Sequence, residues 1–310
     1  MKVCVFGSDG RCVTIAGILA EGGAEVTLAA PRVDFVDAVN ADGLVLREGR
    51  ADRAVRLRAA TNTVGLGAAD VLILSVDAAH VADAVESAGS VLGRETLAAV
   101  PGRSPESLEA LARVVGAERT FGLWTNIYGR IAAPGRVEAE IGGGRVLLGM
   151  YDGGDDPRLR RFVDLLRPAD LDVEVCGGIV DALWDELLAE LSNGAICALT
   201  GLSYGLLYQQ PELTACARAA VAEGVAVARA VGARLASENA DEIRRRASAG
   251  LPGDYRPRML RDVENGEPCG VADVNGYIVR CGEANGIPTP VNRTLLACLM
   301  GLERGRGLPG

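Results

Sequence analysis

Apolar residues in the first half of the chain form short runs that alternate with longer segments of helical period. The runs at residues 2–6, 25–29, 71–76 and 96–100 are rich in β-branched side chains and predict strands. The segments at 11–21, 79–91 and 105–115 have the spacing of amphipathic helices. Such alternation is typical of a parallel sheet with helices on its faces.

The pattern changes twice further along the chain. Residues 122–149 alternate around glycine-rich turns and predict antiparallel strands. After a turn-rich stretch at 152–157, a period of 3.6 residues predicts helices at 179–199, 211–231, 241–249, 271–285 and 294–302. We therefore predict an α/β protein with a Rossmann-like domain at residues 1–175 and a mainly α-helical domain at residues 176–310.

The amino-acid composition excludes several kinds of functional site. The chain has 310 residues, 49% of them apolar, and a net charge of -9. Lys2 is the only lysine and His80 the only histidine, so sites built on several imidazoles or on a catalytic lysine are excluded or disfavoured, and we predict no metal site. The eight cysteines form no CxxC pair and are predicted to be reduced, mostly buried thiols.

The surroundings of the protein can also be predicted. We find no signal-peptide pattern, no apolar run long enough to span a membrane and no basic stripe, and the pI is about 4.9. We therefore expect a cytoplasmic protein that acts on a small-molecule substrate, without nucleic-acid or membrane partners. The long apolar helices of the second half leave room for a homodimer.

The first strand, turn and helix stand where a dinucleotide-binding domain carries GxGxxG. Here the six residues are Gly7-Ser8-Asp9-Gly10-Arg11-Cys12. A carboxylate at the second glycine position, about 4 Å from a phosphate, would cost on the order of 4 kcal/mol at an effective dielectric of 20. The helix dipole returns only about 0.3–1 kcal/mol. We expect Asp9 to cap its own helix and fill the anion site from within.

Two arginines keep the alternative of NADPH binding open. Arg11 could partly offset Asp9. Arg32 follows the second strand, where a basic residue would meet the 2′-phosphate of NADP.

Several segments in order along the chain resemble ketopantoate reductase (2-dehydropantoate 2-reductase). They are KVCVFG at 2–7, DALWDEL at 181–187, ALTG at 198–201, MLRD at 259–262 and GIPTPVN at 286–292. The resemblance implies a Rossmann-type domain, a helical domain similar to the C-terminal domain of 6-phosphogluconate dehydrogenase, and an active site in the cleft between them. Members of the family reduce a 2-keto acid with NADPH.

The chain departs from that family at its catalytic positions. The lysine that acts as general acid corresponds to Glu186, and the two substrate-binding asparagines correspond to Glu190 and Gly194, with Asn193 one position off register. The serine that holds the substrate carboxylate corresponds to Pro257 or Arg258. The glutamate of the family's TEI segment corresponds to Gly270. Reduction of a keto acid needs a cation near the developing alkoxide, so the family mechanism is not expected.

The replaced positions suggest other chemistry. Glu186 and Glu190 are spaced i,i+4 and share a helix face, which Asn193 continues. Two carboxylates that repel each other would make one a candidate general acid or base, unless arginines pair with them. We take Glu186, Glu190, Asn193 and Asp262 as candidate catalytic residues, although for Asp262 capping or pairing within its own helix is the favoured alternative.

A second group is assigned to substrate binding: Trp124, Asn126, Trp184, Arg256, Arg258 and Cys269. The arginines could hold an anionic substrate or pair with glutamates. Trp184 and Cys269 could also be plain core residues, and Trp124, Asn126 and Tyr128 are expected to share one strand. Asp77 and His80 form either an acid–base pair or a surface pair.

Three functions remain open. The favoured hypothesis is a cofactor-independent, non-redox isomerase, cyclase or lyase that uses the two glutamates for proton transfer on a small metabolite. The alternatives are a divergent NADPH-dependent reductase of a keto group and a non-catalytic pseudoenzyme. The scaffold alone does not choose among them.

Overall fold

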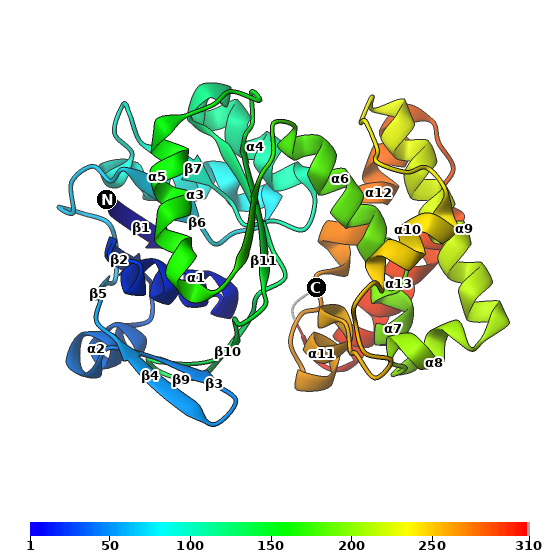
Figure 1. The fold of residues 1–310 in the computed structure, drawn as a ribbon, viewed down its shortest axis with the longest axis horizontal. Helices are drawn as coiled ribbons and strands as arrows, with labels where there is room; N and C mark the ends of the chain where they lie inside the picture. The colour runs from blue at the N-terminus through cyan, green and yellow to red at the C-terminus, as the bar shows by residue number, and fades with distance from the viewer. Residues whose placement is uncertain (309–310) are drawn as a thin grey trace. The chain divides into compact units, whose positions relative to one another are not determined.

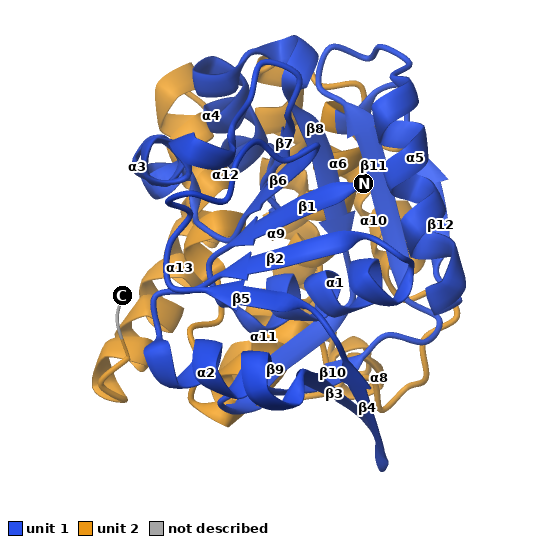
Figure 2. Cartoon of the chain, turned by 90° about the vertical axis from the view of Figure 1, so that its left-hand side faces the viewer, with its two compact units in different colours: residues 1–179 blue, residues 180–310 orange. Residues whose placement is uncertain are grey.

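The computed structural model describes residues 1–308 and divides the chain into two compact units (Figures 1 and 2). Unit 1 spans Met1–Ile179, and unit 2 begins at Val180. The sequence placed the boundary four residues earlier, after residue 175. Residues 309 and 310 of the predicted second domain lie outside the described residues.

Unit 1 is built on a five-stranded parallel sheet of order β5-β2-β1-β6-β7. Its strands are β1 (Lys2–Phe6), β2 (Glu25–Ala29), β5 (Arg58–Ala60), β6 (Val71–Leu74) and β7 (Leu97–Ala99). The chain moves outward from β1 to β2 and β5, and then crosses to the other side of β1 to form β6 and β7. This reversal is the topological switch point of a Rossmann-like fold, so the predicted fold of this half is confirmed.

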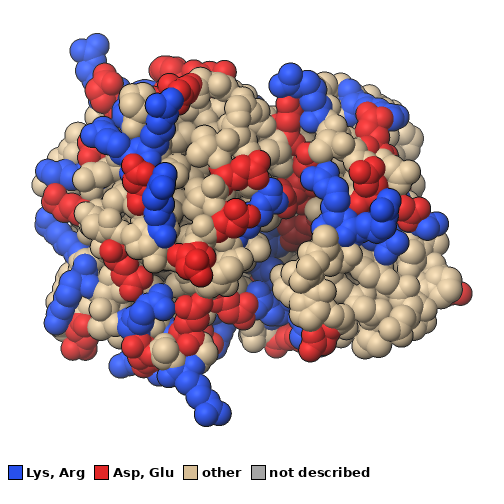
Figure 3. Space-filling view, in the orientation of Figure 1, with Lys and Arg blue, Asp and Glu red and all other residues tan. Residues whose placement is uncertain are grey.

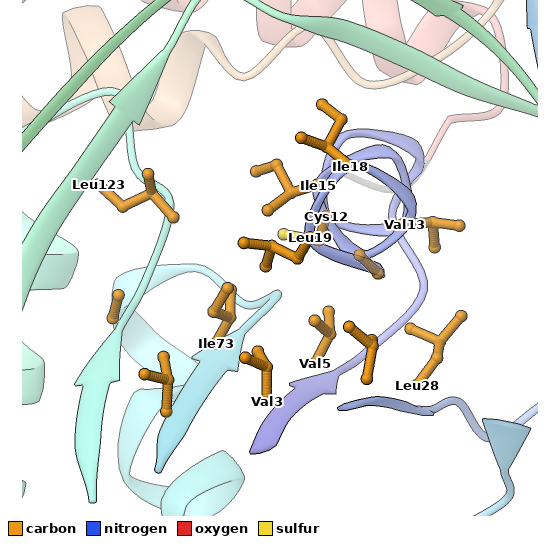
Figure 4. Close-up of a cluster of buried hydrophobic side chains, with 14 of the residues drawn as sticks. Val3, Val5, Cys12, Val13, Ile15, Ile18, Leu19, Leu28, Ile73 and Leu123 are labelled. Atoms are coloured by element: carbon orange, nitrogen blue, oxygen red, sulfur yellow. The ribbon is translucent and has the colours of Figure 1, made fainter. Parts of the chain in front are cut away.

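Both faces of the sheet are buried by helices. Val3, Val5 and Ile73 pack beneath Cys12, Ile15 and Leu19 of α1 (Gly10–Glu21), as Figure 4 shows. Alternate residues of the same strands, among them Cys4 and Leu72, pack on the other face with α3 (Val81–Ser87) and α4 (Pro105–Val115). The near-continuous apolar strands in the sequence follow from this burial on two sides.

The remaining elements of unit 1 were only partly predicted. The helix expected at 79–91 is divided into η1 (Ala78–His80), α3 and η2 (Gly89–Val91). The strands expected at 122–149 belong to two sheets. In one, β11 (Arg145–Met150) lies between β8 (Phe121–Thr125) and β12 (Asp172–Val175) and pairs with both. In the other, β9 (Tyr128–Ala133) and β10 (Arg136–Glu140) join β3 (Leu44–Glu48) and β4 (Ala51–Val55). Helices α2 (Val33–Asp42) and α5 (Pro157–Leu166) and the short η3 (Ala117–Arg119) and η4 (Arg167–Ala169) complete the unit.

Unit 2 is helical throughout its described elements, as the sequence predicts. It contains α6 (Ile179–Leu191), α7 (Gly194–Thr200), α8 (Tyr204–Tyr208), α9 (Pro211–Ala230), α10 (Ala240–Ala247), α11 (Arg258–Asn265), α12 (Val271–Asn285) and α13 (Pro290–Gly305). Their apolar faces form one core around Trp184, Leu187 and Leu188. Within residues 1–308, the structure holds no helix of sufficient length and apolarity to cross a membrane.

One predicted helix is in fact two. The segment 179–199 breaks at Ser192 and Asn193, between α6 and α7. The Ser192 hydroxyl donates to Ala189 O at 2.7 Å, and Asn193 leaves the helical conformation with φ −155° and ψ −34°. Serine and asparagine side chains compete in this way with helical hydrogen bonds. The break removes Asn193 from the helix face that carries the two glutamates.

Candidate functional site

The turn between β1 and α1 lies at the switch point of the parallel sheet. Asp9 is the N-cap of α1, as predicted, and its Oδ1 accepts hydrogen bonds from the backbone N–H of Arg11 at 2.9 Å and of Cys12 at 3.1 Å. Its other oxygen, Oδ2, accepts from the Ser75 hydroxyl, just past β6. Asp9 therefore joins the carboxyl ends of the two strands that flank the switch point.

The charge state of Asp9 follows from its neighbours. Burial among protein atoms by itself raises the pKa of Asp9, but the Arg11 charge and the hydrogen bonds from Ser75 and Cys12 outweigh it, so the pKa lies below its ordinary value. Although protein atoms surround its carboxyl group, Asp9 is an exposed residue. Solvent therefore screens part of these interactions. At neutral pH the group is a carboxylate that fills the helix N-terminus.

Ser75 was not predicted as a site residue. It stands at the end of the apolar strand 71–76, next to β1 in the sheet, where Ser75 N donates to Phe6 O at 2.8 Å. A polar residue at the carboxyl end of a strand next to β1 is the signal that could have identified it, because such ends meet at one edge of a parallel sheet.

The two glycines of the turn serve the backbone. Gly7 has φ +114°, a conformation that other residues rarely adopt, and it turns the chain out of β1. Gly10 lies against β9, where an added Cβ would be 2.2 Å from Gly129 O. Gly10 is therefore required for the close approach of α1 to β9.

Arg11 and Arg32 differ in their surroundings. The Arg11 Nη2 donates to Pro101 O at 2.7 Å, beyond β7, and its Nε makes no hydrogen bond within the described residues. Arg32 lies at the N-cap of α2 and forms an ion pair with Asp34 at 2.6 Å, with each side chain about half exposed (52% and 55%). Arg32 thus presents a charge at the surface just past β2.

In unit 2, Glu186 and Glu190 lie one turn apart on α6, and both are half-buried. A Cβ added to Gly194 would be 3.2 Å from Glu190 Cγ and 3.5 Å from Met259 Cε. Glu190 is therefore beside α11, the helix that carries Arg258 and Asp262. The structure brings these candidate residues into one region of unit 2.

Asn193 has a different role from the one predicted. It is buried in the break between α6 and α7, and its Oδ1 accepts a hydrogen bond from the Tyr204 hydroxyl at 2.7 Å. Burial raises the pKa of Tyr204 well above its ordinary value, which keeps the hydroxyl a donor. The prediction that Asn193 continues the glutamate stripe is wrong, because the helix ends before it. Tyr204 itself was missed, since an isolated tyrosine carries no sequence signal.

The arginines proposed for an anionic substrate have acidic partners. Arg256 forms an ion pair with Glu264. Arg258 Nε lies 3.3 Å from Asp262 Oδ2, and the Asp262 side chain is only 7% exposed. Asp262 therefore pairs within its own helix, which is the alternative given for it above.

Other candidates lie in core or surface positions. Trp184 is 1% exposed and packs against Tyr277, with ring centroids 5.4 Å apart, and Cys269 is fully buried. Their surroundings favour packing over substrate contact. Trp124 is half-buried in β8, whereas Asn126 follows that strand and accepts from Arg145 N at 2.7 Å. Tyr128 begins β9 in another sheet, so the expectation that the three share a strand is wrong.

The remaining polar candidates lie at the surface. His80 Nδ1 and Asp77 Oδ1 are 2.5 Å apart in an exposed pair at the start of η1. In the part of the chain that the structure describes, no group of three or more His, Cys, Asp or Glu side chains could hold a metal ion. Figure 3 shows acidic and basic side chains interspersed over unit 1 and over the upper part of unit 2 in this view, whereas the lower part of unit 2 is largely uncharged.

Two family models match nearly the whole chain. The model described as ketopantoate reductase PanE/ApbA matches residues 3–153, and that of the C-terminal part of the same reductase matches residues 178–303. The chain belongs to the ketopantoate reductase family.

Individual relatives agree. The chain is 28% identical over 299 residues to a 2-dehydropantoate 2-reductase of Halobacterium salinarum, covering 95% of this chain and 96% of the relative. It is 26% identical to the enzyme of that name from Mesorhizobium japonicum, with 99% of each covered. The crystal structure of a family member from Ralstonia eutropha has a TM-score of 0.83 at 27% identity, covering 99% of this chain and all of that one.

One further structure matches in fold alone. D-mandelate dehydrogenase, solved with NADH and anilino(oxo)acetate, has a TM-score of 0.87 at 18% identity and covers 99% of this chain and all of that one.

These comparisons correct the favoured functional hypothesis. The relatives that match over the full length are named as reductases, and a dehydrogenase of the same fold was solved with NADH. The expectation of a cofactor-independent, non-redox enzyme is therefore wrong. The replaced residues in the turn and on α6 are local changes, whereas the similarity to reductases extends over residues 3–153 and 178–303.

Proposed function

We propose that this protein is a nicotinamide-dependent reductase of a keto group in a small metabolite. The observation that carries the proposal is the parallel sheet of order β5-β2-β1-β6-β7, whose switch point lies between β1 and β6. Dinucleotides bind at the carboxyl ends of strands at such a point. The match of both halves of the chain to a reductase family supports the same conclusion.

The residues around the sheet fit such a cofactor at the end that binds the adenosine. Arg32 follows β2 and is about half exposed, and among residues 1–308 its ion pair is with Asp34 alone. A basic residue here would accommodate the 2′-phosphate of NADPH, which NADH lacks. We therefore propose NADPH as the cofactor. At the pyrophosphate end the fit is limited by Asp9, whose carboxylate accepts from the N–H groups of α1.

The chemistry of the helical unit differs from that of the family. The bound cofactor would supply the hydride that reduces the carbonyl carbon. The carbonyl oxygen then needs a proton, and the family's lysine for that task corresponds to Glu186 here. We propose that Glu186 or Glu190 donates this proton in its carboxylic acid form, since both lie on one face of α6.

The substrate is a metabolite with a keto group, and 2-dehydropantoate is the first compound to test because the relatives carry its name. Small 2-keto acids and uncharged ketones complete the panel, because the arginines near α11 already have acidic partners. The homodimer, the cytoplasmic location and the lack of nucleic-acid and membrane partners stay predictions.

The test measures oxidation of NADPH and of NADH by the purified protein across this panel. We expect Arg32→Ala to raise KM for NADPH by about tenfold or more, because a hydrogen bond to a charged group contributes about 1.5–3 kcal/mol, and to leave KM for NADH unchanged. Arg50→Ala is the control, since Arg50 is an exposed arginine of the same unit. If neither nucleotide binds and no compound is reduced, the proposal is wrong.

A further inference from the structure

Asp9 accepts its hydrogen bonds in the part of the fold that would bind a pyrophosphate. In a dinucleotide-binding turn, the backbone N–H groups at the start of the first helix point toward the phosphates. Here two of them, those of Arg11 and Cys12, donate to Asp9 Oδ1 at 2.9 and 3.1 Å. A negatively charged group of the protein itself already holds these donors.

Asp9 is held in place from more than one element. Ser75 donates to its second oxygen, so both carboxylate oxygens have partners. The adjoining backbone is tightly packed, because a Cβ on Gly7 would lie 2.6 Å from Ser75 Cβ. The arrangement therefore links the turn after β1 to the end of β6, across the switch point.

Arg11 adds a positive charge that Asp9 does not fully engage. Its guanidinium is tied to Pro101 O through Nη2, and its buried Nε has no hydrogen-bond partner within residues 1–308. If Asp9 moved away, the two backbone N–H groups would be released for an incoming phosphate, and the Arg11 charge, which already lowers the pKa of Asp9, would be nearby. The same set of donors can thus serve either the carboxylate or the pyrophosphate, but not both.

We propose that Asp9 is an internal anion that competes with the cofactor's pyrophosphate and thereby sets the affinity of this protein for dinucleotides. The inference rests on the proposed function. Binding of the dinucleotide requires the Asp9 side chain to leave Arg11 N, Cys12 N and the Ser75 hydroxyl. A ligand that uses only the adenosine end, such as 2′-AMP, does not require this movement.

The experiment is titration calorimetry of NADPH and of 2′-AMP with the full-length protein and its variants. Asp9→Asn removes the charge but retains a good helix cap, because Asn and Asp cap about equally well. Asp9→Gly removes the competing group altogether. Asp70→Asn is the matched control: Asp70 is another exposed aspartate that accepts a backbone hydrogen bond, from Lys2 N at 2.7 Å, but it precedes β6 at the opposite end of the strands.

We expect Asp9→Asn and Asp9→Gly to bind NADPH at least about tenfold more tightly than the natural protein, which corresponds to about 1.4 kcal/mol. Their affinity for 2′-AMP, and both affinities of Asp70→Asn, should change by less than about twofold. Thermal melting of each variant confirms that it is folded. The inference is supported if the Asp9 variants bind NADPH more tightly than the natural protein and Asp70→Asn does not.

Two results contradict the inference in distinguishable ways. If the natural protein binds NADPH and the folded Asp9 variants bind it equally or more weakly, the competition does not exist, while the proposed function stands. If neither the natural protein nor any folded variant binds NADPH or NADH, the proposed function fails and this inference fails with it.

Discussion

Glu223 caps a helix to which it does not belong. It lies on α9, and its carboxylate accepts from Val291 N at 2.8 Å, from Asn292 N at 3.0 Å and from Asn292 Nδ2 at 2.8 Å. These are groups of the first turn of α13. The N-cap residue of α13, Thr289, makes no side-chain capping bond in the described structure. Glu223 therefore supplies the cap from a neighbouring helix.

The magnitude of this contribution can be derived from the bonds. Each hydrogen bond contributes about 0.5–1.5 kcal/mol net, and a lost helix cap costs about 0.5–2 kcal/mol. The Asn292 side chain is fully buried and retains Ala220 O as an acceptor for its amide at 2.9 Å. We expect Glu223→Ala to lower the free energy of unfolding of unit 2 by about 2–4 kcal/mol, and Glu223→Gln to cost about half as much, because one oxygen can still accept.

The assay is urea unfolding followed by tryptophan fluorescence. The chain has 2 tryptophans, Trp124 in unit 1 and Trp184 in unit 2. In a Trp124→Phe background the signal comes only from Trp184, which is buried against Tyr277, so the transition reports on unit 2. Linear extrapolation of both variants then gives the difference in free energy.

The control tests whether any charge near the same turn would have a similar effect. Glu283 pairs with Arg293 of α13 at 2.7 Å, with both side chains 55% exposed. Such exposed pairs contribute about 0–1 kcal/mol, so Glu283→Ala should cost little. The reasoning is refuted if Glu223→Ala stays within about 0.5 kcal/mol of the parent, or if the two variants cost the same.

Two further predictions concern proton transfer and thiol chemistry. We expect one of the two variants Glu186→Gln and Glu190→Gln to remove the proton donor. That variant should lower kcat by about 10²–10⁴-fold and leave the affinity for NADPH unchanged. Glu212→Gln, an exposed change, serves as the control, and less than threefold loss in both would disprove the role. Exposed Cys298 should react quickly with a thiol reagent in the native protein, whereas Cys4, whose pKa burial raises to about 12, should react only on unfolding. The pKa of Cys4 in the folded protein lies above the ordinary 9.0. The thiol form therefore stabilises the fold below pH 9, and stability should fall as the pH rises from there toward 12. Rapid reaction of Cys4 in the native protein would contradict the predicted protection of this thiol.

The sequence by itself was sufficient for the elements with strong periodicity. The strands at β1, β2 and β6 and the helices α4 and α12 were predicted within one or two residues, because a buried strand or an amphipathic helix shows its environment in its own residues. The order of these elements indicated the parallel sheet and the helical second half. The capping role of Asp9 was also readable, since a cap acts on the two or three residues that follow it.

Only the tertiary structure decided which residues meet across the chain. The hydrogen bond from Ser75 to Asp9 joins residues 66 positions apart, and Glu223 caps a helix 68 positions away. The break at Ser192 and Asn193 is stabilised by a buried partner, Tyr204, that no local pattern reveals. The physical reason is the same in each case: periodicity records what one segment buries, whereas the hydrogen-bond partners that lie far apart in the sequence depend on how distant segments pack.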